Sequence, residues 1–183
     1  LILERGKQVE DRSADVERFW ETGILQPDSN VQFGEGGAGT FSDGKLTTGI
    51  RDFRIKKVLE EFVAAGASSE ILYKAKPHIG TDVLRDVVVN IRNKIISLGG
   101  EIQFESRVTD FLTDPKGRLV GLEVNNVEII NTQAVIAAVG HSARDTFKVL
   151  LNRGIPMEQK PFSIGVRVEH LQSIINESQY GSF

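Results

Sequence analysis

The chain has 183 residues, with 22 basic and 25 acidic side chains, a formal net charge of −3 and no cysteine. The absence of cysteine excludes disulfide scaffolds, thiolate metal sites and dithiol redox chemistry, so any redox function requires a cofactor. The basic residues are scattered instead of forming a stripe, which argues against a nucleic-acid partner. The apolar runs are far shorter than the roughly 20 residues of a membrane span, and no signal peptide precedes them. We therefore expect a soluble, cytoplasmic protein without a membrane partner.

A strand, two helices and a long loop are predicted in the first third of the chain. Residues 1–4 are continuously apolar up to Glu4, as in a strand buried on both faces. Residues 9–21 and 53–65 repeat apolar side chains at helical spacing, and each run is followed by a glycine that favours a helix end. The glycine-rich segment 24–51 between them has no sustained period. We expect it to be a long functional loop or a series of tight turns.

The rest of the chain is predicted to be one helix, a β-meander and a return to the parallel sheet. Residues 81–98 form a strong amphipathic helix, with Thr81 as its candidate N-cap. Four short strand patterns follow within residues 101–131, separated by turn sequences, and predict an antiparallel meander. Residues 134–140 are again continuously apolar, which suits a central parallel strand. A helix over 142–152, capped by Ser142, and a half-buried strand over 162–170 complete the prediction.

The glycine loop contains two apparent phosphate-binding motifs. Residues 34–39 match G-x-G-x-x-G, and residues 39–45 nearly match the Walker A pattern. A dinucleotide fingerprint requires its glycines in a tight turn between a strand and a helix, whereas the preceding segment is a poor strand and no helix follows at once. The Walker pattern lacks its magnesium-binding hydroxyl, because Leu46 follows Lys45. We interpret both matches as consequences of glycine density.

A better candidate for a nucleotide ligand lies upstream, at Glu4. This carboxylate ends a buried strand and is followed by a turn, the position from which a Rossmann unit accepts hydrogen bonds from the adenosine ribose. The glycines of such a unit would lie about 20 residues before Leu1. The chain begins with the apolar run "LILERG" and without an initiator methionine, so we expect a piece of a longer protein. The alternative is that Glu4 only solvates a strand end.

Five segments, in this order, resemble one family. They are "LILERG", "VQFGEGGAGTFSDGKLTT", "KPHIGTDVLR", "AAVGHSARDTF" and "KPFSIGVRVEH". They are similar to the poorly characterised FAD-dependent dehydrogenases, bacterial flavoproteins of the glutathione-reductase-like two-domain class. The resemblance covers essentially the whole chain and is most specific in residues 33–48. Relative to that family, the chain lacks the N-terminal strand with the dinucleotide-binding glycines and stops soon after the second domain begins.

The resemblance implies roles for particular residues. Glu4 would bind the adenosine ribose, with Arg5 beside the adenine or pyrophosphate, and Val108 would contact the adenine through its backbone. Gly140 and His141 would close over the cofactor near the pyrophosphate. The glycine loop would line the ribityl chain and the flavin, because glycines allow close backbone approach and Lys45 offers a donor to the reduced ring. The loop residues implied are Gly36, Gly37, Ala38, Gly39, Thr40, Ser42 and Lys45.

The fold class that follows is α/β. We expect an incomplete Rossmann-like FAD-binding domain over residues 1–154, with a meander insertion, and the start of a substrate-type domain over residues 155–183. The implied function is FAD-dependent oxidoreduction of a small-molecule substrate, with hydride transfer through the flavin and NAD(P)H as a candidate electron donor. No catalytic residue is identified. The competing interpretation is a non-catalytic module that binds a nucleotide or a partner.

Several of these residues have structural alternatives. The loop glycines could serve only to form turns, and His141 could cap the helix that follows it. Asp43 and Lys45 could form a surface pair. Neither His78 nor His170 has a second histidine or a carboxylate at ligand spacing, so we expect structural or substrate-domain roles for them and predict no metal site.

Overall fold

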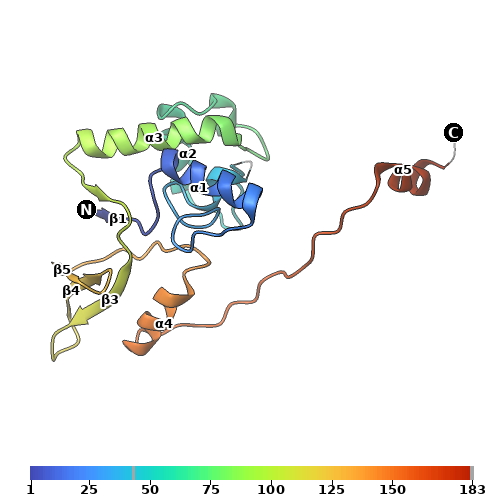
Figure 1. The fold of residues 1–183 in the computed structure, drawn as a ribbon. Helices are drawn as coiled ribbons and strands as arrows, with labels where there is room; N and C mark the ends of the chain where they lie inside the picture. The colour runs from blue at the N-terminus through green and yellow to red at the C-terminus, as the bar shows by residue number, and fades with distance from the viewer. Residues whose placement is uncertain (43, 182–183) are drawn as a thin grey trace.

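The structure, a computed structural model, describes residues 1–42 and 44–181. It is a mixed α/β fold with one two-stranded parallel sheet and one three-stranded antiparallel sheet (Figure 1). The strands are β1 (Ile2–Leu3), β2 (Ile102–Gln103), β3 (Val108–Thr113), β4 (Leu119–Val124) and β5 (Glu128–Asn131). The α-helices are α1 (Val9–Thr22), α2 (Arg54–Ala64), α3 (Thr81–Ser97), α4 (Arg144–Asn152) and α5 (Gln172–Tyr180), and the 3₁₀ turns are η1 (Ala38–Phe41) and η2 (Ser69–Leu72).

The parallel sheet joins the start of the chain to the segment after α3. Ile2 pairs with Ile102 and Leu3 with Gln103, so the predicted strand at residues 1–4 is present but short. Segment 101–106 was predicted to open the meander, and this is wrong because its strand pairs with β1 instead. Only one edge of β1 is paired among the described residues, and Leu1 is 59% exposed. The predicted burial on both faces is therefore not observed.

The antiparallel sheet β3–β4–β5 confirms the meander with three strands in place of four. Asn125 and Asn126, which connect β4 to β5, have φ of 54° and 61°. Together with Val127 they form a three-residue connection, in which the Val127 N–H closes a tight turn on the Val124 carbonyl at 3.1 Å. Asparagine tolerates the left-handed conformation of such a turn better than most residues. At the β3–β4 turn, the Asp114 carboxylate accepts the N–H groups of Lys116 and Arg118 at 2.8 and 2.9 Å. Both turn sequences therefore set the register of the sheet.

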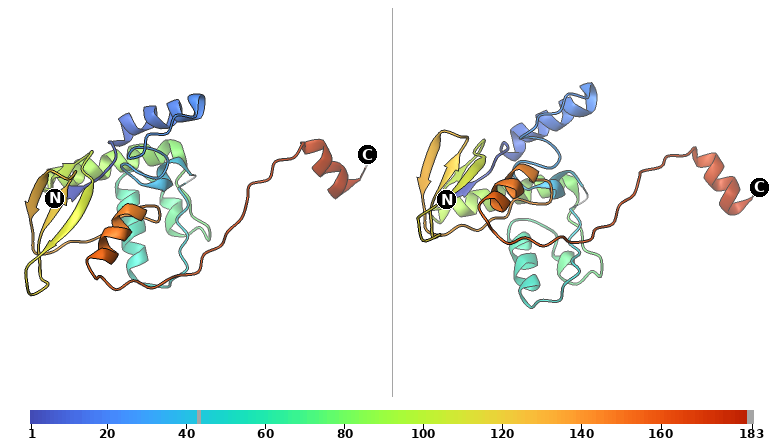
Figure 2. Two further views of the ribbon diagram at one scale, coloured as in Figure 1. Left: turned by 60° about the horizontal axis from the view of Figure 1, so that its bottom comes forward. Right: turned by 90° about the horizontal axis from the view of Figure 1, so that it is seen from below.

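Two predicted strands are absent from the described residues. No strand forms over residues 134–140, and Ile136 is 95% exposed. Residues 162–170 are extended and exposed, and Figures 1 and 2 show this segment running away from the rest of the molecule to α5. An apolar run records a preference for burial, but a strand also needs a neighbour for its backbone hydrogen bonds. Neither segment has such a neighbour in the part of the chain described here.

The helices form most of the core. Val87 on α3 is fully buried, and it packs in a cluster with residues of α2 and η2 such as Ile71. Helix α1 ends as predicted, because Gly23 adopts φ of 73° and donates its N–H to the Phe19 carbonyl at 2.8 Å. The apolar spacing of this helix predicts a buried face that includes Val9, Val16 and Trp20. Val9 and Val16 are buried as predicted, but Trp20 is 62% exposed, and Arg12 is fully buried although it is charged.

Two helix starts also differ from the prediction. Helix α3 has Gly80 and not Thr81 as its N-cap, and α4 begins at Arg144 after Ala143, so Ser142 is not a cap. No helix in residues 1–42 or 44–181 is long and apolar enough to cross a membrane.

Candidate functional site

A cavity of about 290 Å³ lies where the end of β1, the glycine loop, the start of β3 and the segment before α4 meet. We call it cavity A. Its walls are formed by Leu3, Glu4, Arg5, Gln32, Phe33, Gly34, Gly37, Ala38, Ser106, Val108, Ala138, Val139, Gly140, His141 and Ser142. Four segments that are far apart in sequence therefore converge on one space.

Seven of the twelve implied cofactor residues line cavity A. They are Glu4, Arg5, Gly37, Ala38, Val108, Gly140 and His141. These are the residues that the resemblance places at the adenosine and pyrophosphate end of the cofactor, together with two residues of the glycine loop. The sequence alone does not show that these residues lie close together, because their proximity is produced by the fold.

Glu4 has one oxygen engaged in the loop and one available. Its Oε1 accepts the N–H of Gly6 at 2.8 Å and the N–H of Gly34 at 3.1 Å. Among the described residues, no donor is bonded to Oε2. Glu4 therefore has a structural role beyond solvating the end of a strand, because its carboxylate connects the segment after β1 to the glycine loop by hydrogen bonds. A second acceptor still remains for a ligand.

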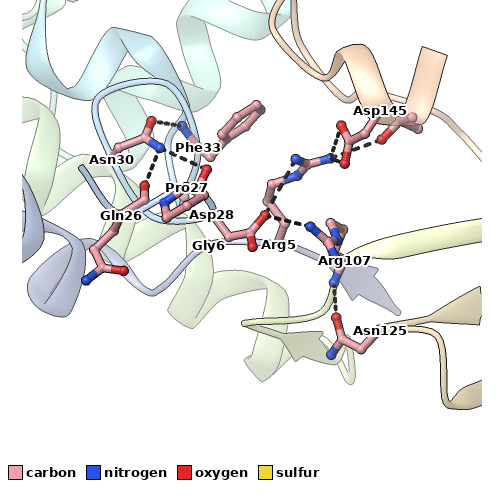
Figure 3. Close-up of polar contacts among 12 residues, drawn as sticks. Arg5, Gly6, Gln26, Pro27, Asp28, Asn30, Phe33, Arg107, Asn125 and Asp145 are labelled. Carbon is pink, nitrogen blue, oxygen red and sulfur yellow. Dashed lines mark hydrogen bonds and ion pairs between the residues drawn. The ribbon is translucent and has the colours of Figure 1, made fainter. Parts of the chain in front are cut away.

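Arg5 is held by several partners at the edge of cavity A. Its Nη2 donates to both carboxylate oxygens of Asp145 at 2.9 and 3.0 Å and to the Thr146 hydroxyl at 3.1 Å. Its Nη1 lies 3.6 Å from Asp28, and its guanidinium stands 4.4 Å from the centre of the Phe33 ring. Figure 3 shows Arg5 reaching from β1 to Asp145 on α4. The contact fixes α4 relative to β1, so the role of Arg5 beside a ligand would be shared with a structural one.

The environment of Asp145 favours its charged form. Burial by itself would raise the pKa of this carboxyl, but the Arg5 hydrogen bonds and the backbone N–H groups at the start of α4 hold the pKa below its usual range. An anionic side chain at a helix N-terminus is also favoured by the helix dipole. The Asp145 carboxylate is therefore ionised at neutral pH.

Two loop glycines are required by close packing. A Cβ on Gly34 would lie 2.4 Å from Cδ of Arg12, and a Cβ on Gly36 would lie 2.2 Å from Oγ1 of Thr40. Both glycines also have positive φ, of 119° and 82°. Gly37 and Gly39 differ, because nothing lies within 4 Å of a Cβ built on either. The turn-forming alternative thus accounts for Gly34 and Gly36, and also for Gly37, whose φ is 63°, whereas Gly39 has neither a positive φ nor a close neighbour at its Cβ position.

The remaining loop residues lie away from cavity A. Gly36, Gly39 and Lys45 line a second cavity of about 350 Å³, cavity B, which is largely apolar and shares Glu4 with cavity A. Cavity B is completed by Ile2, Glu35, Gly44, Leu46, Phe62, Leu84, Val88, Ile91, Arg92, Ile95, Ile102 and Phe104. Thr40 is fully buried and Ser42 donates to the Ala38 carbonyl at 3.1 Å, and neither lines cavity A or cavity B. Asp43 lies outside the described residues.

The polar wall of cavity B is an acid–base cluster. Arg92 donates to Glu35 at 2.9 Å and to Glu10 at 3.1 Å. Burial raises the pKa of Glu35, an effect that the Val9 N–H and Arg92 only partly offset. The Glu35 carboxylate also accepts the Val9 N–H at 2.8 Å and thereby caps α1.

His141 does not cap α4. The helix has Ala143 as its N-cap residue and no side-chain cap bond, and the His141 ring instead stands 6.4 Å from the Phe162 ring, edge to face. No group of three or more His, Cys, Asp or Glu side chains able to hold a metal occurs within residues 1–42 and 44–181.

Two contributors to the site were not identified from the sequence. Phe33 supplies an aromatic wall to cavity A, and its position directly before Gly34 was the only available signal. Arg12 lies buried beneath the loop, and no motif in the sequence points to it. A charged residue is almost never fully buried unless it is paired, so its residue type argues against this position.

Comparison with known proteins identifies one similar chain. It is an uncharacterised protein of Clostridium beijerinckii, 50% identical over 182 residues, and the alignment covers 100% of this chain but 34% of the relative. The chain thus spans about a third of the length of the relative that it matches. No protein-family model matches the chain.

Proposed function

We propose that this chain forms part of the FAD-binding domain of a flavin-dependent oxidoreductase, with cavity A receiving the adenosine end of the cofactor. The observation that carries the proposal is the convergence of seven implied cofactor residues, from four separate segments, on one cavity. Residues that bind one cofactor must border one space, and the convergence of these seven supports the proposal on that ground. Residues with unrelated structural roles would not be expected to meet in this way.

The donors and acceptors of cavity A suit an adenosine. Glu4 offers a carboxylate oxygen of the kind that accepts ribose hydroxyl protons. Phe33 and the apolar atoms of Leu3 and Val108 offer surface on which an aromatic base can pack. The cavity volume of about 290 Å³ is near the lower end of small-molecule sites, about 300–1,000 Å³. It matches a nucleoside better than a whole dinucleotide.

The glycine loop provides a route from cavity A toward cavity B. Gly37 and Ala38 line the first cavity, and Gly36, Gly39 and Lys45 line the second. In the proposal, this part of the loop binds the ribityl chain, and Lys45 orients the ring and stabilises negative charge near it. Bound FAD would supply the ability to accept a hydride from a small-molecule substrate, with NAD(P)H as a candidate electron source.

Cavity A also borders two apolar segments whose backbones are incompletely paired. Leu3 in β1 lines one wall, and residues 138–140 of the exposed apolar run line another. A further extended strand that pairs with Ile2 and with residues 134–137, and that ends where cavity A begins, would satisfy both edges, complete a parallel sheet and leave the cavity open. We propose that FAD binding depends on such a strand, supplied by a longer polypeptide.

The test compares this 183-residue chain with the whole polypeptide to which it belongs. The whole protein is expected to be purified with bound flavin, identified by its absorbance and by extraction of FAD, whereas the isolated chain is expected to hold little or none. Stoichiometric flavin on the isolated chain would refute the dependence on a further strand. A whole protein that neither retains nor binds FAD would refute the function.

A nucleotide-binding module without redox chemistry is the second candidate. It is favoured by the positions of Thr40 and Ser42. The resemblance implies that both residues contact the flavin, but neither lines cavity A or cavity B. The two candidates differ in which half of FAD they recognise. Competition of FAD, ADP and riboflavin for the whole protein separates them: a module binds ADP as tightly as FAD, whereas a flavoprotein gains at least tenfold from the flavin half.

A further inference from the structure

Arg12 occupies an unusual position for an arginine. It lies on α1 and is fully buried beneath the glycine loop. Its Nε donates to the Asn30 carbonyl at 2.8 Å, and its Nη2 donates to the Gly37 carbonyl at 2.9 Å. Its Nη1 donates to the carbonyls of Gly34 at 3.2 Å and Glu35 at 2.5 Å. One guanidinium therefore binds four carbonyls of a segment that is eight residues long.

The charge of Arg12 is balanced without a direct ion pair. Burial lowers the pKa of Arg12 to about 10, and the nearby carboxylates of Glu4 and Glu35 act in the opposite direction. The guanidinium is therefore protonated at neutral pH. It also stands 4.9 Å from the centre of the Phe41 ring, where the ring face attracts a cation. These contacts offset the cost of burying a charge.

Arg12 lines neither cavity, but the loop that it binds lines both. Gly34, Gly37 and Ala38 border cavity A, and Gly36 and Gly39 border cavity B. We propose that Arg12 is a positioning residue, which fixes the loop in the shape that forms the two cavities by binding its carbonyls from behind. Its effect on the loop is independent of any ligand, and its effect on FAD binding rests on the function proposed above.

The geometry requires an arginine and not merely a positive charge. The guanidinium presents five N–H donors in a rigid planar fork, whereas a lysine ammonium is a single compact centre with three donors. Four carbonyls approach Arg12 from around that plane. Gly34 packs directly on the stem of the side chain, since a Cβ there would meet Cδ at 2.4 Å. A lysine would keep the charge and lose most of these bonds.

The experiment is amide hydrogen exchange on Arg12→Lys in this chain, with Arg18→Lys as the matched control. Arg18 lies on the same helix, but its side chain is 47% exposed and its ion pair with Asp15 is long, at 3.4 Å. Arg12→Lys is expected to exchange the amides of residues 33–40 at least tenfold faster and to leave those of α3 within twofold of wild type. Arg18→Lys is expected to change neither. Unchanged exchange of residues 33–40 in Arg12→Lys overturns the proposal.

A second variant reaches the same contact from the loop. Gly34→Ala retains Arg12 but forces its side chain to move, and Gly37→Ala serves as its control because it also places alanine at a positive φ of the same loop while nothing lies within 4 Å of a Cβ there. If Arg12→Lys also loosens α3, Gly34→Ala decides: exchange in residues 33–40 is expected to be faster than in Gly37→Ala, with α3 unchanged. If both variants loosen α3 and the loop together, Arg12 supports the whole fold and the positioning role is overturned.

A third arm separates this proposal from the proposed function. Arg12→Ala is compared with and without millimolar ethylguanidinium, with ethylammonium as the control. Restored protection of residues 33–40 by ethylguanidinium alone supports the positioning role even if no protein binds FAD. Conversely, if the whole protein binds FAD equally with and without the Arg12→Lys change, the function stands and the effect of Arg12 on FAD binding is overturned.

Discussion

Substitution of Glu4 by glutamine tests whether its carboxylate holds the glycine loop. Glutamine retains an oxygen that can accept the N–H groups of Gly6 and Gly34, but it removes the negative charge. A hydrogen bond to a charged group contributes about 1.5–3 kcal/mol and one between neutral groups about 0.5–1.5 kcal/mol. Two bonds that each lose about 1 kcal/mol imply a destabilisation of about 2 kcal/mol.

The expected loss is measurable by urea denaturation. With the urea dependence usual for small proteins, about 1–3 kcal/mol per molar, the unfolding midpoint of Glu4→Gln should fall by about 1 M. Glu128→Gln is the control, since the Glu128 side chain is exposed at the start of β5 and its carboxylate has no hydrogen-bond partner among the described residues. Its midpoint should change by less than the equivalent of about 0.5 kcal/mol.

The result would also separate the two roles of Glu4. If Glu4→Gln leaves the unfolding free energy within about 0.5 kcal/mol of wild type, the carboxylate does not hold the loop and the reasoning from the two N–H contacts is refuted. If the chain is destabilised, the ligand role of Oε2 is examined separately in the whole protein. In that protein, glutamine replaces an anionic acceptor for a ribose hydroxyl. The loss of FAD binding free energy should therefore exceed the loss of unfolding free energy in the same variant.

Three further outcomes follow from the described contacts. Arg153 holds the pKa of Asp110 below its usual range, so this carboxylate stabilises the fold above about pH 4 and ceases to do so as the pH falls further. Asp110→Asn should therefore lower the free energy of unfolding by up to about 1 kcal/mol at pH 7, and this free energy should then fall less steeply below about pH 4 than in wild type. Urea unfolding at a series of pH values measures both effects. An unchanged dependence on pH below about pH 4 would contradict the prediction. Val87→Ala removes two methyl groups from a fully buried position and should cost about 2–3 kcal/mol in the same assay, whereas a cost below about 1 kcal/mol would show that the core collapses around it. Ile136→Thr changes a side chain that is 95% exposed. It should change the free energy of unfolding of this chain by less than about 0.5 kcal/mol but lower the melting temperature of the whole protein. Equal shifts of the melting temperature in both would argue against a further strand beside residues 134–140.

Local sequence signals were reliable where one segment could satisfy its own requirements. Gly23 ends α1 through a left-handed C-cap, and Asn125 and Asn126 form the hairpin turn of the meander. These features depend on backbone conformation and on hydrogen bonds within a few residues. A single sequence contains that information because the residue types limit the accessible φ and ψ angles.

Signals that depend on a partner were less reliable. Residues 134–140 and 162–170 have the composition of buried strands, yet no described strand lies beside either. Segment 101–106 resembles the first strand of the meander, but its strand pairs with β1, about 100 residues earlier. Strand patterns specify a face and a length, and they do not specify which other strand supplies the hydrogen bonds.

The glycine loop combines both kinds of information. The sequence by itself determined that residues 24–51 form a glycine-rich loop or a series of turns, that an acidic residue ends the first strand, and that neither phosphate-binding motif has its required context. Only the tertiary structure decided that Glu4 bonds to Gly34, that Arg12 lies buried beneath four loop carbonyls, and that Val108 and Gly140 border the same cavity. The physical reason is that a charged side chain is placed by its hydrogen-bond partners, and those of Arg12 are carbonyls that any residue could provide.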